Sequence, residues 1–192
     1  GNSHGVWFRQ AGPDKQELAG NVFGSRRRLA LALGVDERSL LDETNRRLRT
    51  PVAPVEIDSA DAPVHAVVLH ENEADLTALP VHLQHGQDGA PYISATLDFS
   101  RDPKTGHTNV GMRRLMLRGR REAGIDLNAP SDLRAIYGGA HSEKNRLPVA
   151  FAVGSHPADA IAALAMTPPT DELALMGAMR GAAVPVVKCV TS

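Results

Sequence analysis

Cysteine and long apolar runs are both scarce in this sequence of 192 residues. The single cysteine, Cys189, excludes a disulfide within the chain and fits a reducing compartment such as the cytoplasm. No apolar run approaches the roughly 20 residues that a membrane-spanning helix needs, and no stretch resembles a signal peptide. We therefore expect a cytoplasmic protein that has no membrane partner.

An excess of one charge is also missing. The chain has 21 Lys and Arg against 22 Asp and Glu, a net charge of -1, and its pI is about 6.8. Affinity for nucleic acid or an anionic membrane depends mainly on clustered cations, so neither is an expected partner. Two short basic runs, Arg26–Arg28 and Arg118–Arg121, are interpreted as solvated faces. With 42% hydrophobic and 22% charged residues, the chain can bury a core as one domain or two small ones.

The amino-terminal part mixes strands and helices. Alternation of apolar residues in Gly1–Gln10 indicates a strand that begins within a sheet. A capping serine and a terminating glycine bound a helix over Ser25–Gly34, and Ser39–Arg49 has the pattern of a second, amphipathic helix. Pro51–Pro63 is typical of a linker, and His65–Leu69 predicts a short strand.

The second half predicts a hairpin followed by helices and strands. Tyr92–Phe99 alternates apolar and polar residues, which predicts a half-buried strand paired with residues 109–117 across the turn Asp102–Gly106. The further elements that we expect are helices after Pro130, over Ala158–Ala165 and after Thr167–Glu172, an apolar strand buried on both faces at Leu147–Gly154, and a final strand at Val184–Cys189.

The stretch around Asn109 carries the strongest candidate for chemistry. The strand period of two puts Asn109, Gly111 and Arg113 on one face and Met112 with Arg114 on the other, unless a bulge at Gly111 redirects the chain. A bulge there would bring Asn109 and Arg114 to one ligand, and the Asn109 amide oxygen could bind a hard cation. Composition alone favours a plainer interpretation, a hairpin with a basic outer strand.

The isolated histidines are weaker candidates. His82 and His85 lie three residues apart, but no Cys or carboxylate accompanies them in a ligand spacing, so loop histidines are the preferred interpretation. His156, before Pro157, is interpreted as a capping or loop residue rather than a catalyst.

The segment Asn109-Val110-Gly111-Met112-Arg113-Arg114 resembles the Asn-x-x-x-x-Arg signature of the UbiD-type decarboxylases, which use prenylated FMN. The preceding segments Asp88–Ser94 and Arg101–Gly106 share this resemblance, which extends from about Gly20 to Cys189. Other matches, in the order found in the family, are Asn21–Arg26, Asp75–Pro80, Pro148–Pro157 and Glu172–Gly181.

The resemblance implies a metal site built from three residues. In the family, an Asn, a His and a Glu hold a metal ion that bridges to the flavin phosphate, and the matching residues here are Asn109, Asp132 and Glu172. Asp132 stands in place of the histidine, and a carboxylate there suits Mg²⁺ or Mn²⁺. His141, in a glycine-rich segment, is the rival ligand. Taken alone, Asp132 and Glu172 would be ordinary acids in the first turn of a helix.

The resemblance also implies which residues meet the cofactor and the substrate. Arg114 is expected beside the reacting carboxylate, as the catalytic residue. Ser94 lies where relatives carry a hydroxyl near the flavin, although an outward serine is the alternative. The residues expected to contact prenylated FMN are Asn109, Val110, Gly111, Met112, Arg113, Arg114, Ser131, Asp132 and Glu172.

In fold, the resemblance implies an α+β protein, with a small α/β amino-terminal lobe over residues 1–80. Residues 81–192 would form the first part of a flavin-reductase-like split β-barrel with flanking helices. We expect the chain to be cut at both ends, so that the catalytic glutamates and a carboxy-terminal domain lie outside it, and the fragment alone to be inactive.

The function implied is reversible, non-oxidative decarboxylation of aromatic, heteroaromatic or α,β-unsaturated carboxylic acids by a carboxy-lyase. The cofactors would be prenylated FMN with Mn²⁺ or Mg²⁺, and K⁺ as a further ion. Expected partners are the acid substrate, the remainder of the same polypeptide, a second copy in a homodimer or larger homo-oligomer, and a flavin prenyltransferase that supplies the cofactor. The alternative is a non-catalytic flavin-binding or assembly module of the same fold, for which Asp132 is the best argument.

Overall fold

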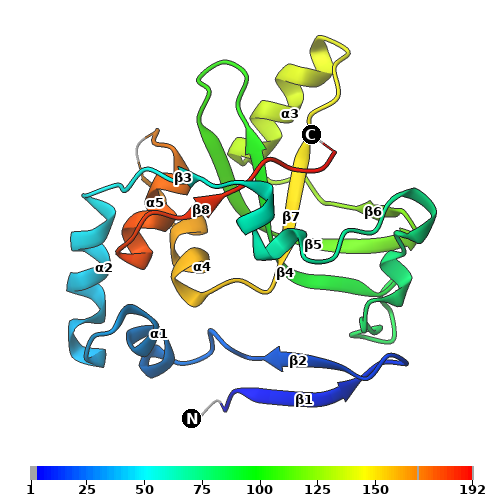
Figure 1. The fold of residues 1–192 in the computed structure, drawn as a ribbon, viewed down its shortest axis with the longest axis horizontal. Coiled ribbons are helices and arrows are strands. Elements are labelled where there is room, and N and C mark those ends of the chain that lie inside the picture. The colour runs from blue at the N-terminus through cyan, green and yellow to red at the C-terminus, as the bar shows by residue number, and fades with distance from the viewer. Residues whose placement is uncertain (1–3, 168, 192) are drawn as a thin grey trace.

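The computed structural model describes residues 4–167 and 169–191, and it is a mixed α+β structure in which an antiparallel sheet has helices beside it (Figure 1). Residues 1–3 of the first predicted strand, and Pro168 before the last predicted helix, lie outside the described residues. The strands are β1 Val6–Ala11, β2 Gln16–Gly20, β3 Val55–Glu56, β4 Tyr92–Arg101, β5 Thr108–Gly119, β6 Glu122–Gly124, β7 Val149–Val153 and β8 Pro185–Val186. The α-helices are α1 Arg26–Leu33, α2 Leu40–Leu48, α3 Asp132–Ser142, α4 Pro157–Ala163 and α5 Glu172–Arg180.

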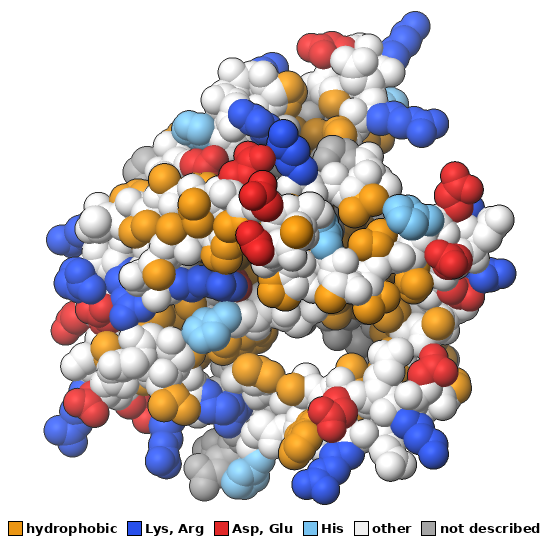
Figure 2. Space-filling model, in the orientation of Figure 1, with side chains coloured by type: hydrophobic (Ala, Val, Ile, Leu, Met, Phe, Trp, Pro, Cys, Tyr) orange, Lys and Arg blue, Asp and Glu red, His pale blue; other side chains and the backbone are white. Residues whose placement is uncertain are grey.

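The amino-terminal hairpin pairs β1 with β2 in a two-stranded antiparallel sheet, with Val6 opposite Gly20. The strand predicted for this region is confirmed, but in the described part of the chain it belongs to a separate hairpin rather than to the middle of a sheet. Its base is held by Arg28, which donates to the carbonyls of Asn21 at 2.7 Å and Val22 at 3.0 Å. Its tip approaches Pro80, and Figure 2 shows an opening between the hairpin and the rest of the molecule.

Helices α1 and α2 confirm the two helices expected before residue 50. Gly34 ends α1 with a φ of 71°, a left-handed conformation that costs glycine little, and its N–H bonds back to the carbonyls of the last turn. A short 3-10 turn at Glu37–Ser39 leads into α2. The apolar faces of both helices pack into the main core, where Leu33 and Leu40 are buried.

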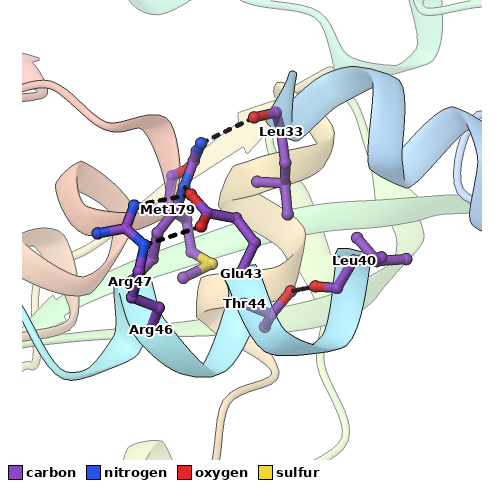
Figure 3. A network of polar contacts seen from close by, with 7 residues as sticks. All are labelled: Leu33, Leu40, Glu43, Thr44, Arg46, Arg47 and Met179. Carbon is purple, nitrogen blue, oxygen red and sulfur yellow. Dashed lines mark hydrogen bonds and ion pairs between the residues drawn. The ribbon is translucent and has the colours of Figure 1, made fainter. Parts of the chain in front are cut away.

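Arg47 of α2 connects three helices (Figure 3). Its guanidinium donates to the carbonyl of Leu33 at the end of α1 at 2.7 Å, and to that of Met179 near the end of α5 at 2.5 Å. Glu43, one turn earlier in α2, accepts from the Arg47 Nε at 2.7 Å. Because the carbonyls of a last helical turn have no partner within the helix, a cation placed there satisfies them and opposes the negative end of the helix dipole.

The main sheet has the strand order β6-β5-β4-β7 and is antiparallel throughout. The hairpin of β4 and β5 confirms the predicted pairing across Asp102–Gly106. Leu97 and Val110 face a core shared with α4 and α5, whereas Ile93 faces a smaller cluster with Leu115. One extra residue on β4 between Ile93 and Thr96 shifts the register and produces this change of face.

Two of the other predicted strands differ from the structure. The strand predicted at His65–Leu69 is wrong: the described chain has a 3-10 turn at Pro63–His65 there, and Val67 is 75% exposed because no strand pairs with this segment. The strand at Val149–Val153 exists but is not buried on both faces, since it lies at an edge of the described sheet and Val153 is 61% exposed.

The predicted final strand is reduced to β8, which pairs in parallel with β3 inside the predicted linker. Strands β2 and β6 were not predicted. The predicted helices after Pro130, over Ala158–Ala165 and after Thr167–Glu172 are confirmed as α3, α4 and α5. The division of the chain at residue 80 stays a prediction. Among the described residues, no helix is long and apolar enough to span a membrane.

Candidate active site

The beginning of β5 meets the beginning of α5, and backbone donors of the strand bind acids of the helix. Strand β6 pairs only with the far half of β5, so in the described chain the amides of the first half face no neighbouring strand on that side. Asp171, the N-cap of α5, accepts from Thr108 N at 2.9 Å, and Glu172 accepts from Val110 N. Unpaired amides at a sheet edge need acceptors, and these two carboxylates supply them.

Asn109 lies between those two amides, and its side chain also reaches Glu172. Its Nδ2 donates to Glu172 Oε2 at 2.9 Å. Its Oδ1 is buried and accepts no hydrogen bond from any residue that the structure describes. Ser100, directly opposite on β4, has a buried hydroxyl that is likewise unpaired among the described residues. A buried acceptor beside a carboxylate is an unfavourable arrangement that a bound cation would relieve.

These groups open into a cavity of about 380 Å³. The cavity lies between the β4–β5 turn, the first turns of α3 and the segment that leads into α5, and Figure 1 shows α3 beside that hairpin. The turn is rigidified by Asp102, whose carboxylate accepts from Lys104 N at 2.9 Å and Thr105 Oγ1 at 3.0 Å. The residues that line the cavity include Asp102, Thr105, His107, Thr108, Asn109, Asp132, Ala135, Ile136, Thr170 and Glu172.

Asp132 reaches the same cavity from α3. Ser131 caps that helix by accepting from Arg134 N at 3.3 Å, so that Asp132 is the first helical residue and its exposed side chain faces solvent in the cavity. Burial raises the pKa of Glu172, and the negative charges of Asp132 and Asp98 raise it further, against the hydrogen bonds from Val110 and Asn109. The structure therefore brings Asn109, Asp132 and Glu172 to one cavity, although they are far apart in sequence.

The donor set consists of one amide oxygen and two carboxylates. Such hard oxygen donors suit Mg²⁺ or Mn²⁺, and the unpaired Asn109 Oδ1 gives a cation a specific partner, so the residues present fit the metal implied by the resemblance. Within the described ranges, no group of three His, Cys, Asp or Glu residues is placed to hold a metal by itself. The amide of Asn109 is thus an essential part of the candidate site.

Arg114 lies on the opposite face of β5 from Asn109. Gly111 pairs regularly with Asp98, so the bulge considered at that glycine is on β4 instead, opposite Arg114. The Arg114 guanidinium is 5.9 Å from the ring centroid of Tyr92, and the side chain is exposed. Val110 and Met112 share that face and pack into the core. Arg113 shares the Asn109 face, with Nη2 3.4 Å from Ser131 Oγ.

His107 lines the cavity, but the four histidines considered from the sequence do not. His141, the rival ligand, lies in the last turn of α3, is exposed and stacks on Tyr137 at 5.7 Å, so the geometry favours Asp132. His156 caps α4 by accepting from Ala158 N at 3.2 Å, which confirms the capping interpretation. His82 and His85 are exposed in a loop, also as expected.

Two acids near the site were missed from the sequence. Asp171 precedes Glu172 and resembles any helix cap, so nothing local indicated its bond to β5. Asp98 is completely buried in β4, and burial raises its pKa while Arg113 opposes the shift. The alternation of Thr96, Asp98 and Ser100 in an apolar strand was the available signal, because three polar side chains then share one face.

Comparison with known proteins agrees with this geometry. Residues 55–192 match the 3-octaprenyl-4-hydroxybenzoate carboxy-lyase Rift-related domain, and residues 7–48 match the N-terminal domain of the same family. The chain is 30% identical over 169 residues to anhydromevalonate phosphate decarboxylase of Methanosarcina mazei, covering 88% of this chain and 38% of that protein. It is 29% identical to gallate decarboxylase of Lactiplantibacillus plantarum, covering 93% of this chain and 38% of the relative.

Among solved structures, the UbiD-class enzyme HmfF from Pelotomaculum thermopropionicum in complex with FMN superposes with a TM-score of 0.86 at 32% identity. The match covers 92% of this chain and 40% of HmfF. The chain thus spans about two fifths of the length of the relatives that it matches. With both amino-terminal family domains matched in order, the chain belongs to the UbiD family of carboxy-lyases.

Proposed function

We propose that this chain is the cofactor- and metal-binding part of a UbiD-class decarboxylase that acts on an aromatic, heteroaromatic or α,β-unsaturated carboxylic acid with prenylated FMN. The observation that carries the proposal is the convergence of Asn109, Asp132 and Glu172 on one cavity, with the buried Asn109 Oδ1 left without a partner among the described residues. Relatives that are decarboxylases, and the solved relative that holds FMN, support it.

In this proposal, Asn109, Asp132 and Glu172 would hold a divalent cation, which would neutralise charge on the flavin phosphate. Prenylated FMN, when bound, supplies the electron sink for loss of CO₂. The backbone of β5 fixes Asn109, because its neighbouring amides are anchored by Asp171 and Glu172. Glu172 has a pKa raised by burial, and a nearby cation would favour its ionised form.

Arg114 is the residue proposed to pair with the carboxylate of the substrate. A guanidinium forms two parallel charge-assisted bonds with a carboxylate, which fixes its orientation as well as its charge. The exposed Arg114 side chain, next to Tyr92, is available for such a pair in the complete polypeptide. Contacts of Val110, Gly111, Met112 and Ser131 with the cofactor stay predictions.

A second candidate is a non-catalytic flavin-binding or assembly module. Asp132 stands where the family has histidine, and Arg114 is on the opposite face of β5 from Asn109. Both observations favour a protein that binds a flavin without catalysing decarboxylation. The two candidates differ in one outcome, since both bind flavin but only the enzyme releases CO₂.

The test uses the protein expressed from its complete gene. Bound metal is measured by elemental analysis and flavin by absorbance, after production together with a flavin prenyltransferase. Release of CO₂ is then assayed with a panel of aromatic and α,β-unsaturated acids. Flavin and metal with CO₂ release support the enzyme, and flavin without CO₂ release supports the module. Absence of both flavin and metal contradicts the proposal. Completion of a split β-barrel, homo-oligomeric assembly, use of K⁺ and a cytoplasmic location stay predictions.

A further inference from the structure

Asp98 and Arg113 form an unusual ion pair in the middle of the main sheet. Asp98 is completely buried, yet neither of its carboxylate oxygens accepts a hydrogen bond from the residues that the structure describes. Its nearest cation is the Nε of Arg113, 3.5 Å from Oδ1, and that Nε is itself buried without a hydrogen-bond acceptor in the same described set. The pair is therefore close enough for attraction but not closed into a bonded salt bridge.

A second buried pair in the same chain shows what a closed bridge looks like here. Asp159 of α4 is 1% exposed, and Arg180 of α5 donates to both of its oxygens, at 2.6 Å from Nε and 2.5 Å from Nη2. In this bidentate contact, two nitrogens of the guanidinium are bonded to the carboxylate, and the pair links α4 to α5. Among the described residues, the hydrogen bonds of the Arg113 guanidinium are all long, at 3.4 Å to Met112 O and 3.4 Å to Ser131 Oγ.

Gly111 creates the space for the Asp98 and Arg113 side chains. It pairs directly with Asp98, and a Cβ at this glycine would lie 2.8 Å from Asp98 Oδ1 and 3.4 Å from Arg113 Cζ. Any side chain at Gly111 would therefore displace Asp98, the guanidinium, or both. The strand period puts Arg113 on the face of Asn109, whereas Arg114 is on the other face.

We propose that Arg113, oriented by Asp98, is the cation that pairs with an oxyanion of the molecule bound along the Asn109 face. The oxyanion is a phosphate of the flavin, or the carboxylate of the substrate with Arg113 in place of Arg114. A guanidinium binds either anion through paired donors. Asp98 acts as a positioning residue: it lies beside the Nε of Arg113, while the two terminal nitrogens make their contacts with Met112 and Ser131. The inference rests on the proposed function and assigns the anion contact on this face to Arg113.

The test measures ligand binding by the protein from the complete gene, without its cofactor. FMN and riboflavin, which differ by the phosphate, are titrated by flavin fluorescence, and benzoate is titrated by thermal shift. The variants are Arg113→Gln, Arg113→Lys, Asp98→Asn and the double variant Asp98→Asn with Arg113→Gln. Arg118→Gln, which removes an exposed charge from the same strand, and Arg180→Gln, which opens the closed bridge, are the matched controls.

We expect Arg113→Gln to lower the affinity for either FMN or benzoate by about tenfold. Arg113→Lys should restore part of that affinity. Loss of FMN affinity with riboflavin unchanged assigns the oxyanion to the phosphate, and loss of benzoate with FMN unchanged assigns it to the carboxylate. Asp98→Asn should weaken the same probe, with little further effect in the double variant because the two residues act as one unit.

Several results would overturn the inference. Unchanged FMN and benzoate affinity in Arg113→Gln removes the anion contact, and an equal loss in either control variant makes the effect non-specific. Normal affinity in a folded Asp98→Asn removes the positioning role, and if that variant does not fold, the two Arg113 variants still decide the anion contact. Failure of the unsubstituted protein to bind FMN and metal would count against the proposed function instead.

Discussion

At the scale of single residues, Glu172 is a buried carboxylate that lies near other negative charges. Its carboxylate accepts from Asn109 and Val110, while burial and the charges of Asp132 and Asp98 raise its pKa. Three carboxylates near one cavity repel one another unless a cation separates them. The same side chain also closes the edge of β5, so a structural and a ligand role coincide in Glu172.

Replacing Glu172 tests the ligand role. In the protein from the complete gene, we expect Glu172→Gln to lower bound divalent metal and bound flavin by about tenfold or more, because an amide is a weaker ligand than a carboxylate. The measurement is metal content by elemental analysis with flavin by absorbance. Asp171→Asn is the matched control: asparagine caps a helix about as well as aspartate and keeps an acceptor oxygen for Thr108 N, so this loss of charge should leave metal content unchanged. Unchanged metal in Glu172→Gln contradicts the assignment.

Arg114 should matter for turnover rather than for folding. Its exposed guanidinium contacts only Tyr92 among the interactions described above, so Arg114→Lys should leave the melting temperature nearly unchanged. Lysine keeps the charge and loses the planar pair of donors, worth about 1.5–3 kcal/mol in a charge-assisted contact. We expect the variant to retain flavin and to decarboxylate at least about tenfold more slowly. Full CO₂ release by the variant would exclude this role.

The candidate ligands could be found from the sequence because their order and spacing match a family pattern. What the sequence did not give was the orientation of each side chain. Strand alternation correctly placed Asn109 and Arg114 on opposite faces of β5. The bulge, however, is on the neighbouring strand β4, between Ile93 and Thr96. A bulge depends on the partner strand as much as on local residues, so a single segment carries little signal for it.

At the scale of elements, α4 and α5 are joined by the closed pair of Asp159 and Arg180. Removing Arg180 leaves a buried carboxylate without its cation, so Arg180→Gln should lower the free energy of unfolding by about 2 kcal/mol after allowance for the partial exposure of Arg180. Thermal or urea unfolding measures the loss, which corresponds to a fall of about 4–8 °C in Tm. Lys188→Gln, which opens an exposed pair with Glu56, should change Tm by less than about 2 °C. Equal effects would show that burial is not the cause.

Helix α2 contributes to the stability of the folded state in a pH-dependent way. Hydrogen bonds from Arg46 and then Arg47 lower the pKa of Glu43 to about 2. A lowered pKa means that the charged form is favoured in the folded state, so this stabilisation is present above the unfolded value near 4.5 and is lost as pH falls towards about 2. The difference in Tm between the unsubstituted protein and Glu43→Gln should therefore shrink between pH 5 and pH 2. A constant difference across that range would contradict the linkage.

The elements themselves were predictable to different degrees. Helices α1, α3 and α5 have caps that can be identified locally, such as Gly34, Ser131 and Asp171, and each was expected. The segment His65–Leu69, wrongly expected to be a strand, has suitable residue types but pairs with no strand of the described chain. The opposite error occurred for β3, which lies inside the predicted linker. Its two-residue parallel pairing with β8 has no sequence period to detect.

At the scale of the whole molecule, the β1–β2 hairpin is attached only loosely. In the described chain its side chains contribute no member to either core cluster, and Trp7 and Phe8 are 60% and 52% exposed. An isolated two-stranded hairpin is marginally stable in water. We expect its amides to exchange with deuterium at least about tenfold faster than those of β4 and β5. Mass spectrometry of peptides covering residues 6–20 and 92–119 makes the comparison, and equal protection would contradict the loose attachment.

The guanidinium of Arg47 bonds to a carbonyl 132 residues further along the chain, and β3 pairs with β8 near the carboxyl end. During synthesis, α1 and α2 therefore leave the ribosome long before the helix that covers them exists. Leu33 and Leu40 must stay exposed to water, or to a chaperone, until α5 has been translated. Because closing so long a loop is slow, ordering of the amino-terminal helices should be a late event in folding, governed by the synthesis of α4 and α5 rather than by the helices' own propensity.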